Sequence, residues 1–200
     1  MIAPFPENID RIAFGWYVSG FTDGEGCFSL FADCRTRRGK KQERPTPSAS
    51  FAINLRRDDI GILELIQSYF RCGAIVYGKT RHLCLLRFRK LEELDVIVKH
   101  FEVFTLLAKK KNDFAVWRDG VRLMLMVSRI KQRRSQMYGA AYKWSSDSHA
   151  FFMSLKQELE DGRKFKEVSD EENSVRDPSQ SHIFLDPNMR GVSGEESAAR

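Results

Sequence analysis

Two carboxylates interleaved with glycines end an apolar helical run near the N-terminus. Asp23 and Glu25 alternate with Gly24 and Gly26 directly after residues 11–22. The helical spacing of the apolar residues changes there to alternation, and glycine provides the permissive backbone that such a corner needs. A carboxylate at a helix-to-strand corner is a suitable ligand for a hard cation such as Mg²⁺. The simpler interpretation is a turn, because Asp-Gly pairs are common turn formers.

The helix that must position these carboxylates is predicted over residues 11–22, after an N-cap at Asp10. Residues at helical spacing within it are Ile12, Trp16, Ser19 and Gly20. Gly20 and Gly24 are four residues apart, so one face of the helix lacks side chains and another backbone can approach it closely. Tight packing on the chain's own core would explain the glycines nearly as well.

Two segments after this corner alternate between apolar and polar residues and are predicted to be half-buried strands. In the first, Phe28, Leu30, Ala32 and Cys34 face one way, and Ser29, Phe31, Asp33 and Arg35 face the other. In the second, Ala49, Phe51, Ile53 and Leu55 alternate with Ser48, Ser50, Ala52 and Asn54. Between them, residues 35–45 carry six cations and one acid, which indicates a basic hairpin loop.

The following elements repeat this helix, strand, strand order. Asp58 or Asp59 is expected to cap a helix whose core stripe ends at Phe70. Strands are predicted over residues 74–79 and 81–89, and a helix over 91–101. The predicted class is therefore α+β, an antiparallel four-stranded sheet with helices on one face and the other face open.

The remaining chain divides by composition. Asn112 is expected to cap a helix that ends in the cationic residues 129–134, and a short helix is expected over 150–159. From residue 161 the chain is rich in Asp, Glu, Ser, Pro and Gly, which predicts a disordered acidic tail. The expected organisation is a core over residues 8–127, a basic helical extension over 128–160 and the tail over 161–200.

The charge is unevenly distributed. The net charge of the chain is +6, but residues 157–200 hold 6 basic and 11 acidic residues, which leaves 27 basic and 16 acidic residues before them. The first 156 residues therefore carry +11 (27 − 16), a surplus that favours a polyanionic partner such as nucleic acid. A protein-interaction adaptor would leave this surplus and the acid-glycine corner unexplained.

Cysteine spacing and hydropathy exclude two further classes. The four cysteines form no Cys-x-x-Cys pair and are expected to be reduced packing residues rather than zinc ligands. No run approaches the length of a membrane span, and no signal peptide is visible at the N-terminus, so a soluble intracellular protein with no membrane partner is expected.

Residues 18–26, Val-Ser-Gly-Phe-Thr-Asp-Gly-Glu-Gly, resemble the nonapeptide of the LAGLIDADG homing endonucleases. Residues 53–58 with the apolar stripe after them, and residues 104–114 with their basic run, are similar to further segments of that family. The resemblance covers about residues 8–127 and implies the αββαββα fold, with a saddle-like four-stranded sheet and additional C-terminal helices. It implies a site-specific endonuclease, encoded in an intron or other mobile element, that makes double-strand breaks in DNA.

The family's functional positions fall on particular residues here. The resemblance implies that Glu25 is the catalytic carboxylate that binds Mg²⁺, with Mn²⁺ able to substitute, and that Lys110 is the active-site lysine, with Lys109 as the alternative. Leu55 stands where many relatives have a Gln that orders water near the cut, which leaves Arg56 and Arg57 as candidates for that role.

A single copy of the motif implies a homodimer. Asp119-Gly120 and Asp161-Gly162 lack both the preceding small-residue helix and the following acid. We therefore expect two copies to pack through the helix that carries Glu25, with a pseudo-palindromic DNA site as the consequence. The interface residues expected on that helix and the corner after it are Ser19, Gly20, Asp23 and Gly24.

The open face of the sheet and the basic loop are expected to contact double-stranded DNA. The candidate contacts are Ser29, Phe31, Asp33, Arg35, Arg37, Arg38, Lys40, Lys41, Ser48, Ser50, Asn54, Arg56, Arg57, Lys79 and Arg81. The alternative is a domain of the same fold that binds without cutting, as a transcriptional regulator or as an RNA-splicing maturase on intron RNA. The expected location is the cytoplasm or nucleoid of a bacterium, or an organelle if the gene is organellar.

Overall fold

The computed structural model describes residues 2–33, 36–37, 40–41, 45–78, 82–138 and 144–164. The side chains of residues 33, 36–37, 40–41 and 134–138 are outside this description. Residues 165–200 of the predicted acidic tail and four of the candidate DNA contacts, Arg35, Arg38, Lys79 and Arg81, lie outside the described residues. The first residues of that predicted tail, 161 and 162, are instead helical.

The first helix, α1, runs over Arg11–Glu25 and is longer than predicted. The Asp10 carboxylate accepts a hydrogen bond from the backbone N–H of Ala13 at 2.6 Å, which confirms the predicted N-cap. The backbone N–H of Gly26 donates to the carbonyl of Thr22, so the helical pattern continues through the acid-glycine segment. Glu25 is therefore the last helical residue rather than part of a turn.

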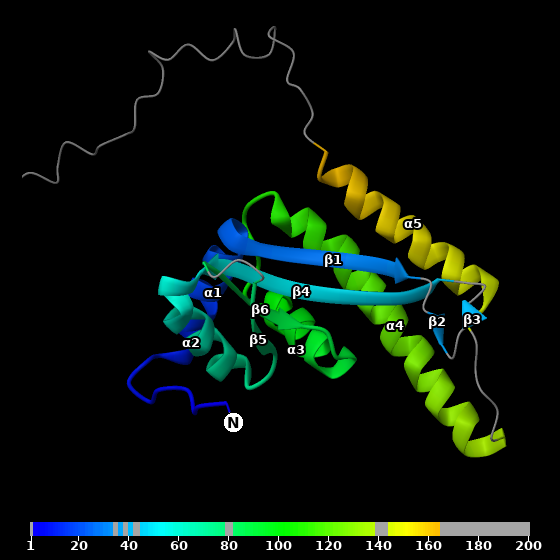
Figure 1. The fold of residues 1–200 in the computed structure, drawn as a ribbon, viewed down its shortest axis with the longest axis horizontal. Helices are drawn as coiled ribbons and strands as arrows, with labels where there is room; N and C mark the ends of the chain where they lie inside the picture. Colours follow the sequence, from blue (N-terminus) through cyan, green and yellow to red (C-terminus); the bar gives the residue numbers. More distant parts are fainter. Residues whose placement is uncertain are drawn as a thin grey trace, which may run out of the picture. The chain divides into compact units, whose positions relative to one another are not determined.

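Four antiparallel strands form the sheet, in the order β1-β4-β6-β5 (Figure 1). They are β1 Gly26–Asp33, β4 Thr46–Arg56, β5 Ala74–Tyr77 and β6 Leu83–Phe88. Phe28, Phe51 and Phe88 lie side by side across three strands. The basic loop between β1 and β4 contains a two-stranded ladder, β2 Thr36–Arg37 with β3 Lys40–Lys41.

Helices cover one face of this sheet. After the short 3-10 helix η1 Arg57–Asp59, they are α2 Ile60–Phe70, α3 Leu91–Val103, α4 Lys110–Tyr138 and α5 Ser146–Gly162. The order αββαββα and the α+β class are confirmed. The expected Asn112 cap is wrong, because α4 already begins at Lys110. The side chain of Asp59 makes no capping hydrogen bond at α2, and the carboxylate of Asp58 is bound to Arg56 instead.

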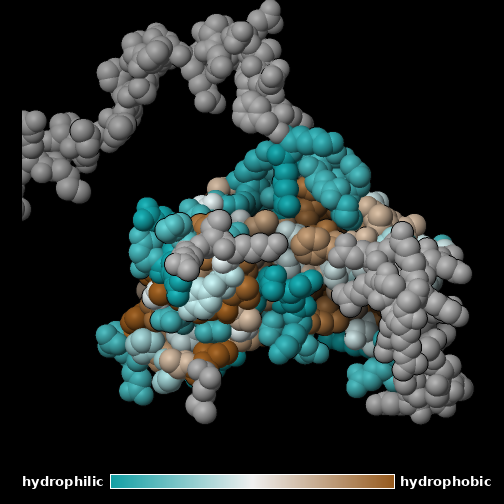
Figure 2. All heavy atoms as spheres, viewed as in Figure 1, coloured by the Kyte–Doolittle hydropathy of each residue, from teal (hydrophilic) through white to brown (hydrophobic). Residues whose placement is uncertain are grey.

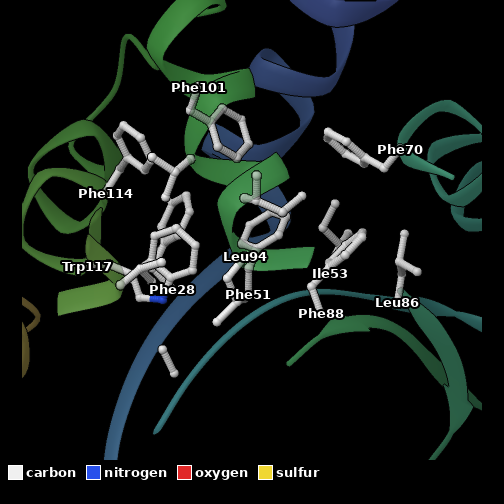
Figure 3. Packing of buried hydrophobic residues seen from close by; sticks show 14 of the residues in the cluster. Phe28, Phe51, Ile53, Phe70, Leu86, Phe88, Leu94, Phe101, Phe114 and Trp117 are labelled. Carbon is white, nitrogen blue, oxygen red and sulfur yellow. The ribbon is translucent and has the colours of Figure 1, made fainter. Parts of the chain in front are cut away.

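Aromatic side chains from the sheet and from α3 and α4 form the core (Figure 3). The rings of Phe28 and Phe51 stack at 4.9 Å, and Phe101 meets both edge-on at 5.7 and 5.6 Å. Trp117 is fully buried beside them and donates its indole N–H to the carbonyl of Ser50 at 3.1 Å. Burying each of these rings contributes about 1.5–3 kcal/mol, so α4 is held firmly on the sheet.

The last helix packs against α4 and the edge strand β1 (Figure 1). Phe152, Leu155 and Leu159 form its buried stripe, while hydrophilic side chains cover its outer surface near the C-terminal end (Figure 2). Arg163 donates to the carbonyl of Phe28 on β1. None of the helices in the described parts of the chain is long and apolar enough to cross a membrane.

Candidate active site at the C-terminal end of α1

The exposed carboxylate of Glu25 ends α1, and no cation among the described side chains pairs with it. The C-terminal end of a helix carries a partial negative charge, so a carboxylate is electrostatically unfavourable there. The two effects create a local negative potential at the surface. A divalent cation is the species that this position attracts.

Lys110, the first residue of α4, reaches back to this helix end. Its ammonium Nζ donates to the carbonyl of Gly24 at 2.6 Å and to that of Asp23 at 3.1 Å. These carbonyls are among those that a helix leaves unpaired at its C-terminus. Lys110 therefore fixes the backbone that carries Glu25 and places a positive charge beside it.

The carboxylate of Asp23 completes the connection between α1 and the start of α4. Its Oδ2 accepts hydrogen bonds from the backbone N–H groups of Leu107 at 2.9 Å and Ala108 at 3.2 Å. Asp23 thus binds the segment before α4 while Lys110 binds the end of α1. Its expected place at a dimer interface stays a prediction.

Cations also surround the start of α4. Lys109 and Lys111 are exposed on either side of Lys110. The ammonium of Lys109 has no hydrogen-bond or ion-pair partner among the described residues, so it can reach a phosphate. Three lysines at a helix N-terminus oppose the macrodipole, and a bound polyanion offsets that cost.

The outer face of α1 lacks side chains where Gly20 and Gly24 lie. Both are exposed, and a Cβ built on either would meet nothing within 4 Å. Trp16 and Tyr17, one turn earlier, are 49% and 43% exposed although they are large and apolar. This face can therefore accept another helix at close range.

Ser19 was expected at the dimer interface, but it does not lie on the exposed face of α1. Its side chain is only 2% exposed, and its hydroxyl donates to the carbonyl of Phe104 at 2.6 Å. Because residues one apart on a helix point about 100° from each other, Ser19 turns inward while Gly20 faces out.

A single copy does not provide a complete metal site within the described part of the chain, where no three His, Cys, Asp or Glu side chains group together. Mg²⁺ binds oxygen donors and commonly takes only one or two protein carboxylates. Glu25 fits as one such ligand, since its carboxylate is exposed and has no partner among the described side chains.

The candidate DNA contacts differ in how exposed their side chains are. Ser29 is half-buried, while Phe31 and Asn54 are exposed on the open face of the sheet. Ser50, which was expected to contact DNA, is instead only 7% exposed, and it lies opposite Ser29 of β1. The Ser48 hydroxyl is likewise buried. For Asp33, Arg37, Lys40 and Lys41 only the backbone is described.

Two arginines at the end of β4 are exposed but already engaged. Arg56 pairs with Asp58 at 2.8 Å, and the Arg57 guanidinium lies 4.8 Å from the centre of the Tyr77 ring. Arg56, Arg57, Asp58 and His82 line a surface cavity of about 390 Å³. Both side chains remain exposed despite these contacts, so Arg56 and Arg57 contribute positive charge to the surface at this end of the sheet.

Two features of this region were not predicted. The alternation of β6 buries Cys84, Leu86 and Phe88 and turns Arg87 to the open face. The hydrogen bonds that Asp23 accepts from Leu107 and Ala108 join residues more than 80 positions apart, and no pattern near Asp23 in the sequence indicates them.

Comparison with known proteins agrees with this geometry. Residues 18–121 match the family described as LAGLIDADG endonuclease. "Probable intron-encoded endonuclease 3" of Neurospora crassa is 30% identical over 110 residues, which are 54% of this chain and 20% of that protein. The chain thus spans about a fifth of that relative.

Solved structures share the fold. The LAGLIDADG meganuclease I-AabMI, bound to uncleaved DNA, is 25% identical with a TM-score of 0.54, covering 71% of this chain and 43% of that one. The homing endonuclease I-TnaI is 23% identical with a TM-score of 0.51, covering 76% of this chain and 98% of that one. With the family match covering more than half of its residues, this chain belongs to the LAGLIDADG endonuclease family.

Proposed function

We propose that this domain cuts DNA as a site-specific homing endonuclease, by metal-dependent hydrolysis of a phosphodiester in each strand. The observation that supports this most is the exposed carboxylate of Glu25 at the end of α1, which has no partner in the described part of the chain, with the Lys110 ammonium bound to the carbonyls beside it. A domain that only binds nucleic acid has no use for an unpaired acid in a phosphate groove, where it repels the ligand.

The active unit is a two-fold homodimer. The Gly20 and Gly24 faces of two copies pack together, and two-fold symmetry then brings the two Glu25 side chains next to each other. Two carboxylates at close range repel each other unless cations lie between them. Mg²⁺, with Mn²⁺ as a substitute, fits this pair of oxygen ligands.

The Glu25 carboxylate of each copy would hold divalent metal ions, which when bound would supply charge neutralisation at the scissile phosphate and activation of a water. The chain's own residues position that chemistry. Lys110 and Asp23 connect the end of α1 to the start of α4, so Glu25 is held on a rigid backbone. Lys109, whose ammonium has no partner among the described residues, contacts the phosphate backbone near the cut.

The substrate is a long, pseudo-palindromic double-stranded DNA site. The open face of the sheet, with Phe31, Asn54 and Arg87, faces the bases, because a major groove admits a β-ribbon of this width. The cations of the basic loop and of Arg56 and Arg57 bind phosphates. The name of the Neurospora crassa relative supports an origin within an intron.

The test is selection of cleaved sites from a randomised duplex library with Mg²⁺, followed by cleavage and binding assays on the selected site. Glu25→Gln should abolish cleavage while binding survives, since the amide keeps the shape and loses the charge. Glu64→Gln, an exposed acid on α2, is the matched control and should cut normally.

Other results would redirect the proposal. Binding of duplex DNA without cleavage in Mg²⁺ or Mn²⁺ would favour a regulator, and preferential binding of folded intron RNA would favour a maturase. A purified chain that stays monomeric at every concentration would indicate that the second α1 face comes from another domain of the same fold.

A further inference from the structure

A second candidate site lies in the helical layer, away from Glu25. Residues of α1, α3 and the segment where α2 ends line a surface cavity of about 580 Å³. This volume is in the range of small-molecule sites, about 300–1,000 Å³. Because the helices cover one face of the sheet, the cavity does not share the open face proposed for duplex DNA. In Figure 2, hydrophobic side chains reach the surface over this helical part of the molecule.

Three basic side chains are among the residues that line the cavity. Arg71 is exposed and has no acidic partner among the described residues. The Arg11 guanidinium lies 4.7 Å from the Tyr69 ring centre and donates to the Tyr69 carbonyl at 3.0 Å, which uses one of its five N–H groups. Lys99 pairs with Asp95 at 2.6 Å. The rim therefore keeps a positive surplus that suits an anion.

The lining of the cavity is partly aromatic and includes His100. His100 is 7% exposed, and its ring packs 4.9 Å from the Phe70 and Phe104 rings. Its Nδ1 lies 3.5 Å from the Tyr69 hydroxyl, while its Nε2 is buried and has no hydrogen-bond partner among the described residues. Burial lowers the pKa of His100 to about 4, so the ring is neutral at pH 7. When Tyr69 donates to Nδ1, Nε2 carries the proton and is a hydrogen-bond donor.

We propose that this cavity binds a nucleotide, either free or as an unpaired residue of a single strand. The base packs on the aromatic side chains beside Phe104, and the phosphate is bound by Arg71 and Arg11. Aromatic floors with cationic rims recognise unpaired nucleotides in this way, because every base has a flat π-face and every nucleotide an anionic group. The His100 ring lines the same cavity, so the signals of its imidazole report a ligand bound there.

The experiment measures binding to the whole chain by calorimetry and follows the ¹⁵N-labelled His100 imidazole by NMR. The probes are 5′-AMP, inorganic phosphate and a 12-nucleotide single-stranded RNA. Arg71→Asn removes the cation and suits the left-handed backbone at this residue, where φ is 56°. The matched control is Arg129→Gln, which removes one exposed charge from α4, a helix that does not line the cavity.

We expect 5′-AMP to bind and to shift the His100 Nε2 signal, with about tenfold weaker binding in Arg71→Asn and no change in Arg129→Gln. Equal affinity for 5′-AMP and the RNA identifies a free nucleotide as the ligand, and RNA binding at least tenfold tighter identifies a strand. The proposal is overturned if inorganic phosphate binds as well as 5′-AMP, if neither nucleotide probe shifts the His100 signal, or if Arg71→Asn binds like the wild type. Glu25→Gln leaves all of these results unchanged, so this test is independent of cleavage.

Discussion

The substitution Gly20→Ala should have two opposite effects, one on the stability of the single folded copy and one on the association of two copies through α1. Gly20 lies in the interior of the helix, is exposed, and would place its new methyl group in open space within one copy. Alanine is favoured over glycine in a helix interior by about 1 kcal/mol. The folded single copy should therefore become more stable by up to that amount.

The effect on association has the opposite sign. An extra methyl group in a closely packed contact costs about 1–3 kcal/mol, and a two-fold dimer contains the substitution twice. The total is about 2–6 kcal/mol, so the dimer dissociation constant should rise at least thirtyfold, at 1.4 kcal/mol per factor of ten.

Urea denaturation measures the first effect and sedimentation equilibrium the second. Gly15→Ala is the control on the same helix: its Cβ would lie 2.6 Å from the Phe104 ring, so it should destabilise the fold. If Gly20→Ala unfolds more easily, or if it associates as tightly as the wild type, the assignment of this face to helix packing is refuted.

Three further changes test the contacts around the site and the core. Asp23→Ala leaves the N–H groups of Leu107 and Ala108 without their acceptor, and should lower the free energy of unfolding by about 2 kcal/mol in urea; equal stability would contradict the connection between α1 and α4. Because burial lowers the His100 pKa from 6.5 to about 4, the unfolded chain binds a proton that the folded chain does not between these values. Stability should therefore fall as the pH falls from 6.5 towards 4, by about 2 kcal/mol from this residue at pH 5, and His100→Phe should remove that component of the pH dependence. Trp117→Phe removes the indole donor from the Ser50 carbonyl in the core and should cost about 2 kcal/mol, measured by thermal unfolding; an unchanged midpoint would contradict the role of that hydrogen bond.

Features that depend on residues close together in the sequence predicted the fold well. Alternation in β1 and β4 identified the buried faces, because the period of a strand fixes which side chains share a side. The N-cap at Asp10 was predictable for the same reason, since its partner is three residues away. Glycine spacing likewise identified Gly20 and Gly24 as an open stretch of helix.

Contacts between distant segments were not predictable. The helix continues to Glu25 although its sequence suggests a turn, and Asp23 and Lys110 bind across the corner from opposite sides. Ser50 alternates like an exposed residue, yet it is only 7% exposed in the folded chain. These outcomes depend on which segments meet in three dimensions, and a one-dimensional pattern does not contain that information.

The central claim is that two Glu25 carboxylates, one from each copy, hold the metal ions that cut both strands. A mixed dimer tests it: wild-type and Glu25→Gln chains carrying different tags are co-expressed, and the mixed species is isolated through both tags. It is then incubated with the selected DNA site and Mg²⁺, and intact, nicked and cut DNA are measured. Shared ions predict that the mixed dimer binds the site but neither cuts nor nicks it, whereas efficient nicking of one strand would show that each copy works alone and would contradict the claim.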